Sequence, residues 1–397
     1  MKSTDSLSIT FMYPSRRIGG AQLLFIRLAI ELSKRDAIVV NVVDFPDGFL
    51  ASQLKNYNKV TILPYSNGCV TINEETVLIT PLSNFADLKY LIKGDFNKIK
   101  ILLWSIHPTN IDYVFASHGR KWFKNVLPVK NFLKLLSDLG NIVYMDEANF
   151  LAAKKVIGLK NHPEFLQVPL EIKDYKSEVK EQADKINIAW LGRISYDKIF
   201  SIIKVVDEIK ALKNNSQIVL HVIGTGEKLD QLELYLKKSG INYLLAGTLV
   251  DDDLSFYMNK YIQIGVAMGT SCMEFATRKI PVFLIDYSVE RFPNNIKYNW
   301  LFETQNYTLG SDIDAVTHRN HTFNDLLHQY ETDESLGQKC YNYVIENHDI
   351  EHVALKLIDH CIGLKPIDNY SFAKIQKILN PAIYRFFYVL YRRMRRF

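Results

Sequence analysis

Residues that could bind an anion and nearby hydroxyl groups follow one another in one short stretch. Met268–Ser271 forms a glycine-containing turn, and Cys272–Arg278 can continue as a short helix. Glycine lets backbone approach a ligand, Thr270 or Ser271 can cap the helix, and free N–H groups at a helix start favour an anion. Glu274 follows one turn later and can accept hydrogen bonds from hydroxyls attached to that anion. The layout suits a diphosphate followed by a ribose, and an ordinary capped turn is the structural alternative.

Two cationic side chains mark a second loop with related chemistry. The apolar run Ile186–Leu191 predicts a buried strand, and the following loop carries Arg193 and Lys198. A helix with regularly spaced isoleucines and valines comes next. Cations at the carboxyl end of a strand suit an anionic ligand. A solvated loop with ordinary surface charges is the alternative when this segment is taken alone.

Glycine turns follow two further predicted strands. Ser8–Tyr13 leads to Gly19 and Gly20, and Gln217–Ile223 leads to the turn Gly224–Glu227. A strand, a glycine turn and a helix make a candidate anion cradle. The first turn is not G-x-G-x-x-G, and no acidic residue is suitably placed for a dinucleotide ribose. The dehydrogenase fingerprint is therefore absent.

Polar residues also end two predicted strands in the first half of the chain. Lys100–Ile106 delivers His107, and Asn141–Met145 delivers Asp146 and Glu147. Ligands of open α/β sheets collect outside the carboxyl ends of the strands, so these side chains indicate a ligand site. A single histidine also has a purely structural interpretation. His107 is therefore a candidate acid–base or acceptor-binding residue.

The elements that must position these residues alternate between apolar strands and helical segments. This alternation predicts an α/β protein with parallel sheets. Further strands are expected at Ala37–Phe45, Val60–Pro64, Thr76–Leu82, Asn242–Ala246, Ile262–Ala267 and Ile280–Ile285. At 397 residues the chain is too long for one typical core, and the charged stretch 167–185 reads as a linker. We expect a first domain over 1–175, a second over 186–365 and a tail over 366–397.

The composition is that of an ordinary globular protein, with 48% hydrophobic and 23% charged residues. The opening MKSTDSLS lacks the apolar core of a signal peptide, and no apolar run would span a bilayer, so a cytoplasmic location is expected. Asp251–Asp253 reads as the acidic start of a helix and not as a metal site. We expect no cofactor or metal and no nucleic-acid partner. The four cysteines lack C-x-x-C spacing, which favours a reducing compartment; they are Cys69, Cys272, Cys340 and Cys361.

The C-terminal tail is strongly basic. Residues 366–397 contain two lysines, five arginines and one aspartate, a net charge of +6, whereas the whole chain carries +5. After Asn380 and Pro381 the sequence AIYRFFYVLYRRMRRF combines large apolar residues with arginines. That composition suits an anionic membrane surface. A helix packed across the domain junction is the alternative, and both can hold together.

Taken in order, these motifs resemble those of a GT-B glycosyltransferase, most closely the retaining family 4 type of bacterial surface-polysaccharide synthesis. WLGRISYDK is similar to the family's G-R…K segment, and VIGTGEKLDQL to the turn near the nucleotide base. AGTLVDDDLSFYMNKYIQIGVA resembles the stretch before the donor motif. Glu274 with Pro281 matches the end of that motif, and Gly19 with Gly20 the N-terminal loop. The resemblance covers most of residues 8–290.

The resemblance implies two Rossmann-like domains that face each other across a cleft, followed by a helical tail. The first would bind the acceptor, and the second a nucleotide-diphosphate sugar whose glycosyl group moves to an acceptor hydroxyl without a metal. The implied catalytic residues are Arg193, Lys198 and His107. The implied donor-binding residues are Gly19, Gly20, Gly224, Gly226, Gly269, Thr270, Ser271 and Glu274. With the basic tail, the resemblance implies a lipid-linked saccharide acceptor of cell-surface polysaccharide synthesis (O-antigen, capsule or a related glycan) and a peripheral position on the inner face of the cell membrane.

One position departs from the family pattern. The family usually has two glutamates separated by seven residues, but the position eight before Glu274 is Val266, and the MGTSCME loop is short. Retaining and inverting transfer therefore both stay open. The alternatives are an inverting GT-B transferase, a sugar-nucleotide epimerase of that fold, and a catalytically degenerate partner subunit. The joint presence of Arg193, Lys198 and Glu274 argues against the last.

Overall fold

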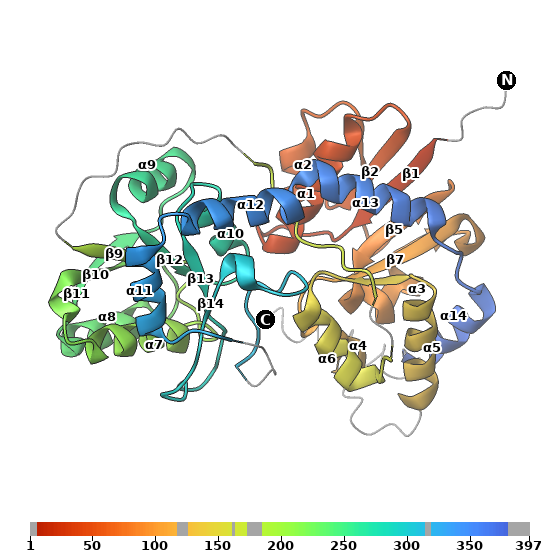
Figure 1. The fold of residues 1–397 in the computed structure, drawn as a ribbon. Coiled ribbons are helices and arrows are strands. Elements are labelled where there is room, and N and C mark those ends of the chain that lie inside the picture. Colours follow the sequence, from red (N-terminus) through yellow and green to blue (C-terminus); the bar gives the residue numbers. More distant parts are fainter. Residues whose placement is uncertain (1–5, 117–125, 161–162, 173–184, 314–318, 380–397) are drawn as a thin grey trace, which may run out of the picture. The chain divides into compact units, whose positions relative to one another are not determined.

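The chain forms two compact α/β units, each built on a six-stranded sheet (Figure 1). The computed structural model describes residues 6–116, 126–160, 163–172, 185–313 and 319–379. The first unit combines residues 1–171 with 350–397, and the second comprises 172–349. The predicted pair of parallel α/β sheets is confirmed. In the described residues no helix is both long and apolar enough to cross a membrane.

The sheet of the first unit is entirely parallel, in the order β3-β2-β1-β5-β7-β8. Its strands are β1 (Leu7–Met12), β2 (Ile38–Asp44), β3 (Val60–Pro64), β5 (Thr76–Pro81), β7 (Ile99–Ser105) and β8 (Ile142–Tyr144). A small parallel pair, β4 (Val70–Ile72) and β6 (Ile92–Gly94), stands apart. The β5 strand is buried along its whole length, as expected for a strand covered on both faces. Because the six strands of the larger sheet are parallel, their carboxyl ends lie along one common edge.

Helices and short 3₁₀ segments connect and cover these strands. They are α1 (Gly20–Ser33), α2 (Phe49–Leu54), η1 (Leu82–Asp87), α3 (Leu88–Leu91), η2 (Phe96–Lys98), α4 (Asn110–Ala116), α5 (Val126–Asp138), α6 (Glu147–Ile157), α13 (Ile350–Gly363) and α14 (Asn369–Leu379). Phe25 and Leu28 on the inner face of α1 are fully buried, and Phe25 packs beside Phe11 of β1. The apolar spacing that predicts α1 is therefore the spacing that fixes it to the sheet.

The helix α13 belongs to the first unit, although the expected second domain ran to residue 365. Figure 1 shows α13 beside α1, and its buried residues Val353 and Leu357 join the core around β1, β2 and α1. The Ile350 N–H donates to the Leu170 carbonyl (2.9 Å) at the start of the helix. The expected boundary differs from this division because the apolar stripe of α13 is buried against α1.

The start of the expected tail also packs into the first unit. Phe372 of α14 lies between Phe85 and Phe96, with ring centroids 6.1 and 5.6 Å away. Gln376 is fully buried, and its amide nitrogen donates to the Phe85 carbonyl (2.6 Å). The expected aromatic and arginine-rich segment, residues 380–397, lies outside the described residues.

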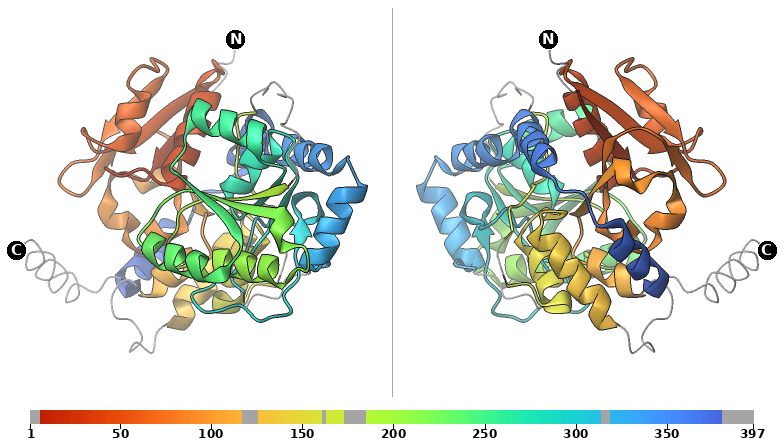
Figure 2. Two further views of the ribbon diagram at one scale, coloured as in Figure 1. Left: turned by 90° about the vertical axis from the view of Figure 1, so that its left-hand side faces the viewer. Right: turned by 90° about the vertical axis from the view of Figure 1, so that its right-hand side faces the viewer.

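The second unit has the strand order β11-β10-β9-β12-β13-β14, parallel except for the last pair. Its strands are β9 (Ile186–Leu191), β10 (Ile218–Ile223), β11 (Asn242–Gly247), β12 (Ile264–Ala267), β13 (Val282–Leu284) and β14 (Asn299–Trp300). Its helices are α7 (Ile199–Ala211), η4 (Asn215–Gln217), α8 (Leu229–Ser239), α9 (Asp251–Tyr261), α10 (Thr270–Ala276), η5 (Leu301–Glu303), α11 (Phe323–Thr332) and α12 (Leu336–His348). Helices α7 and α8 lie side by side against the sheet (Figure 2).

Candidate functional site

The loops after β9 and β10 are joined by backbone hydrogen bonds beyond the ends of their strands. Gly192 N–H donates to the Ile223 carbonyl, and Ile194 N–H donates to the Thr225 carbonyl, both at 3.0 Å. Lys228 N–H returns a hydrogen bond to the Ile194 carbonyl, also at 3.0 Å. These bonds hold the Arg193–Lys198 loop in one place at the carboxyl edge of the second sheet.

Gly224 and Gly226 make this close approach possible. A Cβ added at Gly224 would lie 2.1 Å from the Gly192 carbonyl oxygen, and one at Gly226 would lie 2.4 Å from that of Ile194. Both contacts are with backbone, so a side chain would force the two loops apart. Their expected donor-binding role stays a prediction, and the packing of the loops is by itself a reason for glycine at both positions.

The two predicted cations lie on the same loop of the second unit. Lys198 is the N-cap residue of α7 and is half-buried, whereas Arg193 is exposed. Burial lowers the pKa of the Lys198 ammonium; the Asp197 carboxylate opposes this shift, and the Arg193 guanidinium adds to it. Within the described part of the chain neither cation forms an ion pair. An anionic ligand would therefore stabilise the charged form of Lys198.

The start of α10 lies beside this loop, but it is not capped as expected. Gly269 is the N-cap residue, with φ 62° and ψ −146°, and no side chain caps the helix. The expected capping by Thr270 or Ser271 is wrong, because both residues already lie in the first turn. A Cβ added at Gly192 would lie 3.8 Å from the Ser271 hydroxyl oxygen, which brings the two segments together. The positive φ of Gly269, which glycine adopts without steric cost, turns the chain from β12 into α10.

Glu274 lies on α10, one turn beyond its start. Its side chain is 31% exposed, and its Oε2 accepts a hydrogen bond from Nη1 of Arg278 at 2.9 Å. The Arg278 side chain is only 2% exposed. Sequence reasoning selected Glu274 but missed Arg278. The spacing of four residues between an acid and a base on a predicted helix was the available signal.

Val266 occupies the position where the family pattern has its first glutamate. It lies in β12, pairs with Trp190 of β9, and is fully buried in the core of the second unit. A carboxylate at this place would be buried in the sheet core. The chain therefore presents one glutamate, Glu274, where the pattern has two.

Gly19 and Gly20 lie in the first unit, at the carboxyl edge of its sheet. Gly19 is the N-cap of α1 in an extended conformation (φ −162°), and a Cβ added at Gly20 would meet nothing within 4 Å. The loop before them is held by Asp44, whose buried carboxylate accepts from the N–H of Ser15 (2.8 Å). Open space beside Gly20 agrees with a glycine kept small for a ligand, although that role stays a prediction.

His107 follows β7 at the same edge of the first unit and is exposed. Its Nδ1 accepts from the N–H of Thr109 at 3.2 Å and lies 2.8 Å from the Thr109 hydroxyl. Its own backbone N–H donates to the Asn110 side chain at 3.0 Å. Because Nδ1 is an acceptor, the neutral ring carries its proton on Nε2. The ring is thus suited to donate a hydrogen bond, and its catalytic role stays a prediction.

Asp146, expected to point toward a ligand, instead caps α6. Its Oδ1 accepts from the backbone N–H of Asn149 (2.8 Å) and from the Asn149 side-chain amide (2.6 Å). Burial raises the pKa of the Asp146 carboxyl to about 6, against the effect of these hydrogen bonds. Its observed role is structural.

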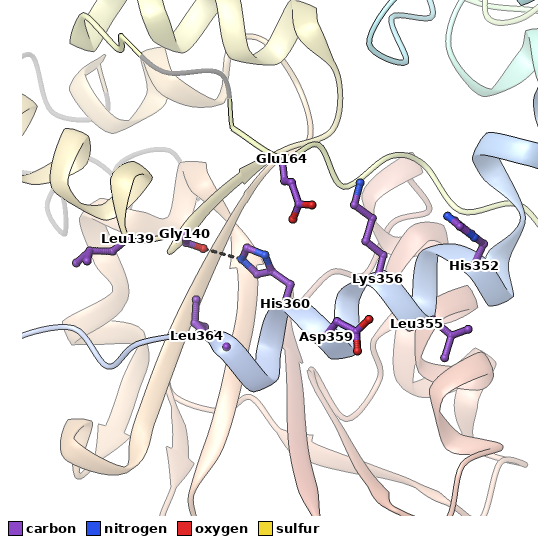
Figure 3. A pocket seen from close by; sticks show the side chains of 10 residues that line it. Leu139, Gly140, Glu164, His352, Leu355, Lys356, Asp359, His360 and Leu364 are labelled. Carbon is purple, nitrogen blue, oxygen red and sulfur yellow. Dashed lines mark hydrogen bonds between the residues drawn. The ribbon is translucent and has the colours of Figure 1, made fainter.

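A pocket of about 640 Å³ lies elsewhere in the first unit, beside α13 (Figure 3). It is lined by Leu139, Gly140, Glu164, His352, Leu355, Lys356, Asp359, His360, Gly363 and Leu364. Gly140 precedes β8, and its carbonyl accepts from Nε2 of His360 (2.7 Å), so the pocket adjoins the amino end of that strand. None of the predicted site residues lines it. Among the described residues, no group of three or more histidine, cysteine, aspartate or glutamate side chains is placed to hold a metal ion.

Comparison with known proteins gives similarity of fold. No protein-family model matches the sequence, and no curated protein matches it. The structure of HepE from Anabaena in complex with UDP-glucose aligns with a TM-score of 0.55 at 13% identity, over 90% of this chain and 100% of that one. The lipopolysaccharide outer core galactosyltransferase WaaB aligns at 0.54 and 11%, over 90% and 99%. A glycosyltransferase from Rickettsia africae aligns at 0.55 and 12%, over 91% and 100%.

These alignments span nearly the whole of both chains and therefore include both α/β units. At this level of identity they establish architecture, not substrate. The fold expected from the motifs is confirmed: the chain has the GT-B fold, which it shares with these glycosyltransferases.

Proposed function

We propose that this protein is a glycosyltransferase that moves a sugar from a nucleotide-diphosphate sugar to an acceptor hydroxyl. The observation that carries the proposal is the grouping of Arg193, Lys198 and the uncapped start of α10 at one edge of the second unit. The GT-B fold, and the UDP-glucose bound to the similarly folded HepE, support the same function.

The proposed chemistry depends on stabilising the leaving group. When the glycosidic bond breaks, negative charge develops on the departing nucleoside diphosphate while the sugar gains oxocarbenium character. Lys198 and Arg193 would stabilise that charge, and the first-turn N–H groups of α10 would add hydrogen bonds. Glu274 would accept hydrogen bonds from the ribose. Gly269 and the glycines at 224 and 226 would keep the loops close enough for these contacts.

The acceptor would bind to the first unit. Gly20 leaves space beside α1, and the exposed His107 side chain lies at the same sheet edge. The basic, aromatic composition of 380–397 suggests that the acceptor is lipid-linked and lies at an anionic membrane surface. A saccharide of cell-surface polysaccharide synthesis fits both features. The similarly folded WaaB is named as a lipopolysaccharide galactosyltransferase.

The test is a panel of sugar nucleotides that varies both base and sugar. The purified full-length chain is incubated with each donor, and release of the nucleoside diphosphate is measured with and without saccharide acceptors. We expect one donor to be hydrolysed slowly and to be turned over faster when an acceptor is added. Conversion to an isomeric sugar nucleotide without release would identify an epimerase. Absence of both binding and turnover across the panel would support a degenerate subunit and overturn the proposal.

A further inference from the structure

Arg278 is the most deeply buried basic side chain near the proposed donor site. Arg278 is not among the site residues predicted from the sequence. Its guanidinium nevertheless forms an ion pair with Glu274, the one glutamate of α10. We infer that Arg278 is a positioning residue, which fixes the Glu274 carboxylate so that the site selects ribonucleotides over 2′-deoxyribonucleotides. This inference rests on the proposed function, because it assumes that Glu274 faces the ribose of the donor.

The guanidinium is held from two helices. Its Nη1 donates to the backbone carbonyl of Glu274 at 2.6 Å and to Oε2 of the same residue at 2.9 Å. Its Nη2 donates to the Ser255 hydroxyl oxygen at 2.7 Å. The Ser255 hydroxyl then donates to the Asp251 carbonyl at 2.9 Å, in the first turn of α9. The carboxylate is therefore connected to α9 through a chain in which each hydrogen bond has a defined direction.

Burial makes this arrangement rigid. A guanidinium with 2% of its side chain exposed cannot exchange its partners for water, so its anionic partner has little freedom to change rotamer. Oε2 is engaged by Arg278, and within the described residues no hydrogen bond reaches Oε1 of Glu274. Oε1 is thus the acceptor left for a ligand hydroxyl. A single fixed acceptor discriminates between a ligand with that hydroxyl and one without it.

The experiment measures affinity for UDP, GDP and ADP, each beside its 2′-deoxy counterpart, by calorimetry. For whichever base binds the wild type, we expect the ribose form to bind about tenfold or more tighter, as for one hydrogen bond to a charged group. Arg278→Met should reduce that ratio at least threefold. Arg278→Lys keeps the charge and should restore part of it, and Ser255→Ala should lower it less than Arg278→Met.

The matched control is a second buried ion pair in the same unit. Arg319 donates to Asp286, and the two side chains are 9% and 8% exposed. Arg319→Met should lower the stability of the protein as Arg278→Met does, because each leaves a carboxylate without its buried cation, but it should leave the ribose-to-deoxyribose ratio unchanged. Glu274→Gln is the reference for loss of the carboxylate: the amide oxygen would turn to Arg278 and leave a donor, the amide nitrogen, toward the ligand, so this variant should itself lower the ratio.

The outcomes separate the two claims. If Glu274→Gln lowers the ratio and folded Arg278→Met does not, the positioning role is wrong while the donor site stands. If Arg278→Met does not fold, the Arg278→Lys and Ser255→Ala ratios decide, and unchanged ratios in both would overturn the inference. If the wild type binds none of the six nucleotides and the sugar-nucleotide panel also finds no donor, the proposed function itself fails.

Discussion

Gly20 and Gly226 are both predicted ligand-binding glycines, yet their surroundings differ. A Cβ at Gly20 would meet nothing within 4 Å, while one at Gly226 would come within 2.4 Å of the Ile194 carbonyl oxygen. At Gly20 an alanine would therefore clash with no neighbouring atom of the protein. Gly226 is required by the approach of two loops.

The two positions therefore give opposite results on substitution. Gly20→Ala, in the first turn of α1, should leave the thermal midpoint equal or slightly raised, since alanine is favoured over glycine in helices by up to about 1 kcal/mol. It should reduce turnover if the acceptor or donor approaches the backbone there. Gly226→Ala should lower the midpoint by several degrees. Thermal unfolding and turnover measured on both variants check this; full activity in Gly20→Ala would show that no ligand approaches that backbone closely.

At the residue scale the sequence pointed to the charges, and the structure added their partners. Arg193, Lys198 and Glu274 are polar residues after apolar strands, a signal that one sequence can carry. The spacing of four residues could have suggested the pair of Glu274 and Arg278, but the burial of the guanidinium against α9 depends on tertiary packing, which no local pattern reports. The N-cap position of Gly269, which leaves α10 without a side-chain cap, was missed because serine and threonine are the usual N-caps.

At the scale of elements, two buried titratable groups make stability depend on pH in opposite directions. Burial raises the pKa of Asp146 to about 6, from 3.8, at the start of α6. Burial lowers the pKa of His221 to about 4, from 6.5, in β10. Between pH 3.8 and about 6 the folded chain keeps the Asp146 proton that the unfolded chain releases. The contribution of Asp146 to stability is therefore fully present below pH 3.8 and is lost as pH rises through about 6. For His221 the contribution is present above pH 6.5 and falls as pH drops toward 4.

Asp146→Asn isolates the first effect, because asparagine is also a good N-cap and does not titrate. We expect the variant to gain stability relative to wild type as pH rises from about 4 to 7, by a difference on the order of 3 kcal/mol for two pKa units. Urea unfolding of both proteins at a series of pH values gives the difference directly, and the His221 contribution cancels. A difference that stays constant over this range would contradict the assigned cause.

Most elements were predictable because their hydrophobic runs are long and bounded by turns. The strands β3 and β9 coincide with the expected Val60–Pro64 and Ile186–Leu191, and β1, β2, β5, β7 and β10 differ by one residue at either or both ends. The small pair β4 and β6 and the two-residue β14 were missed. They are two or three residues long and are fixed by tertiary pairing, so they leave no period in the sequence.

At the scale of the whole molecule, the sequence predicted two α/β units but not the return of the chain to the first. The apolar stripe of α13 has the same appearance whichever unit it covers, and only packing assigns it to α1. The expected tail is likewise divided. Its first helix, α14, is packed through Phe372 and Gln376, whereas its basic part, 380–397, lies outside the described residues.

The basic part of the tail gives a prediction for the full-length chain. It should sediment with anionic liposomes and much less with neutral ones, and added salt should weaken the binding. Each arginine near such a surface contributes about 1 kcal/mol, so replacing four should nearly abolish the difference. The variant changes Arg392, Arg393, Arg395 and Arg396 to serine, and it should keep activity on a soluble acceptor while losing it on a membrane-embedded one. Equal binding to both lipids would remove the physical support for a lipid-linked acceptor.

The central claim is that Arg193 and Lys198 stabilise the leaving diphosphate of a sugar nucleotide. The most direct measurement is single-turnover release of nucleoside diphosphate, with the donor that the panel identifies, by wild type and by the Arg193→Ala/Lys198→Ala double variant. Loss of one such charge-stabilising donor typically costs about 10²–10³ in rate, so we expect at least that loss, with thermal midpoint and circular dichroism nearly unchanged. A folded double variant that releases the diphosphate at the wild-type rate would contradict the claim.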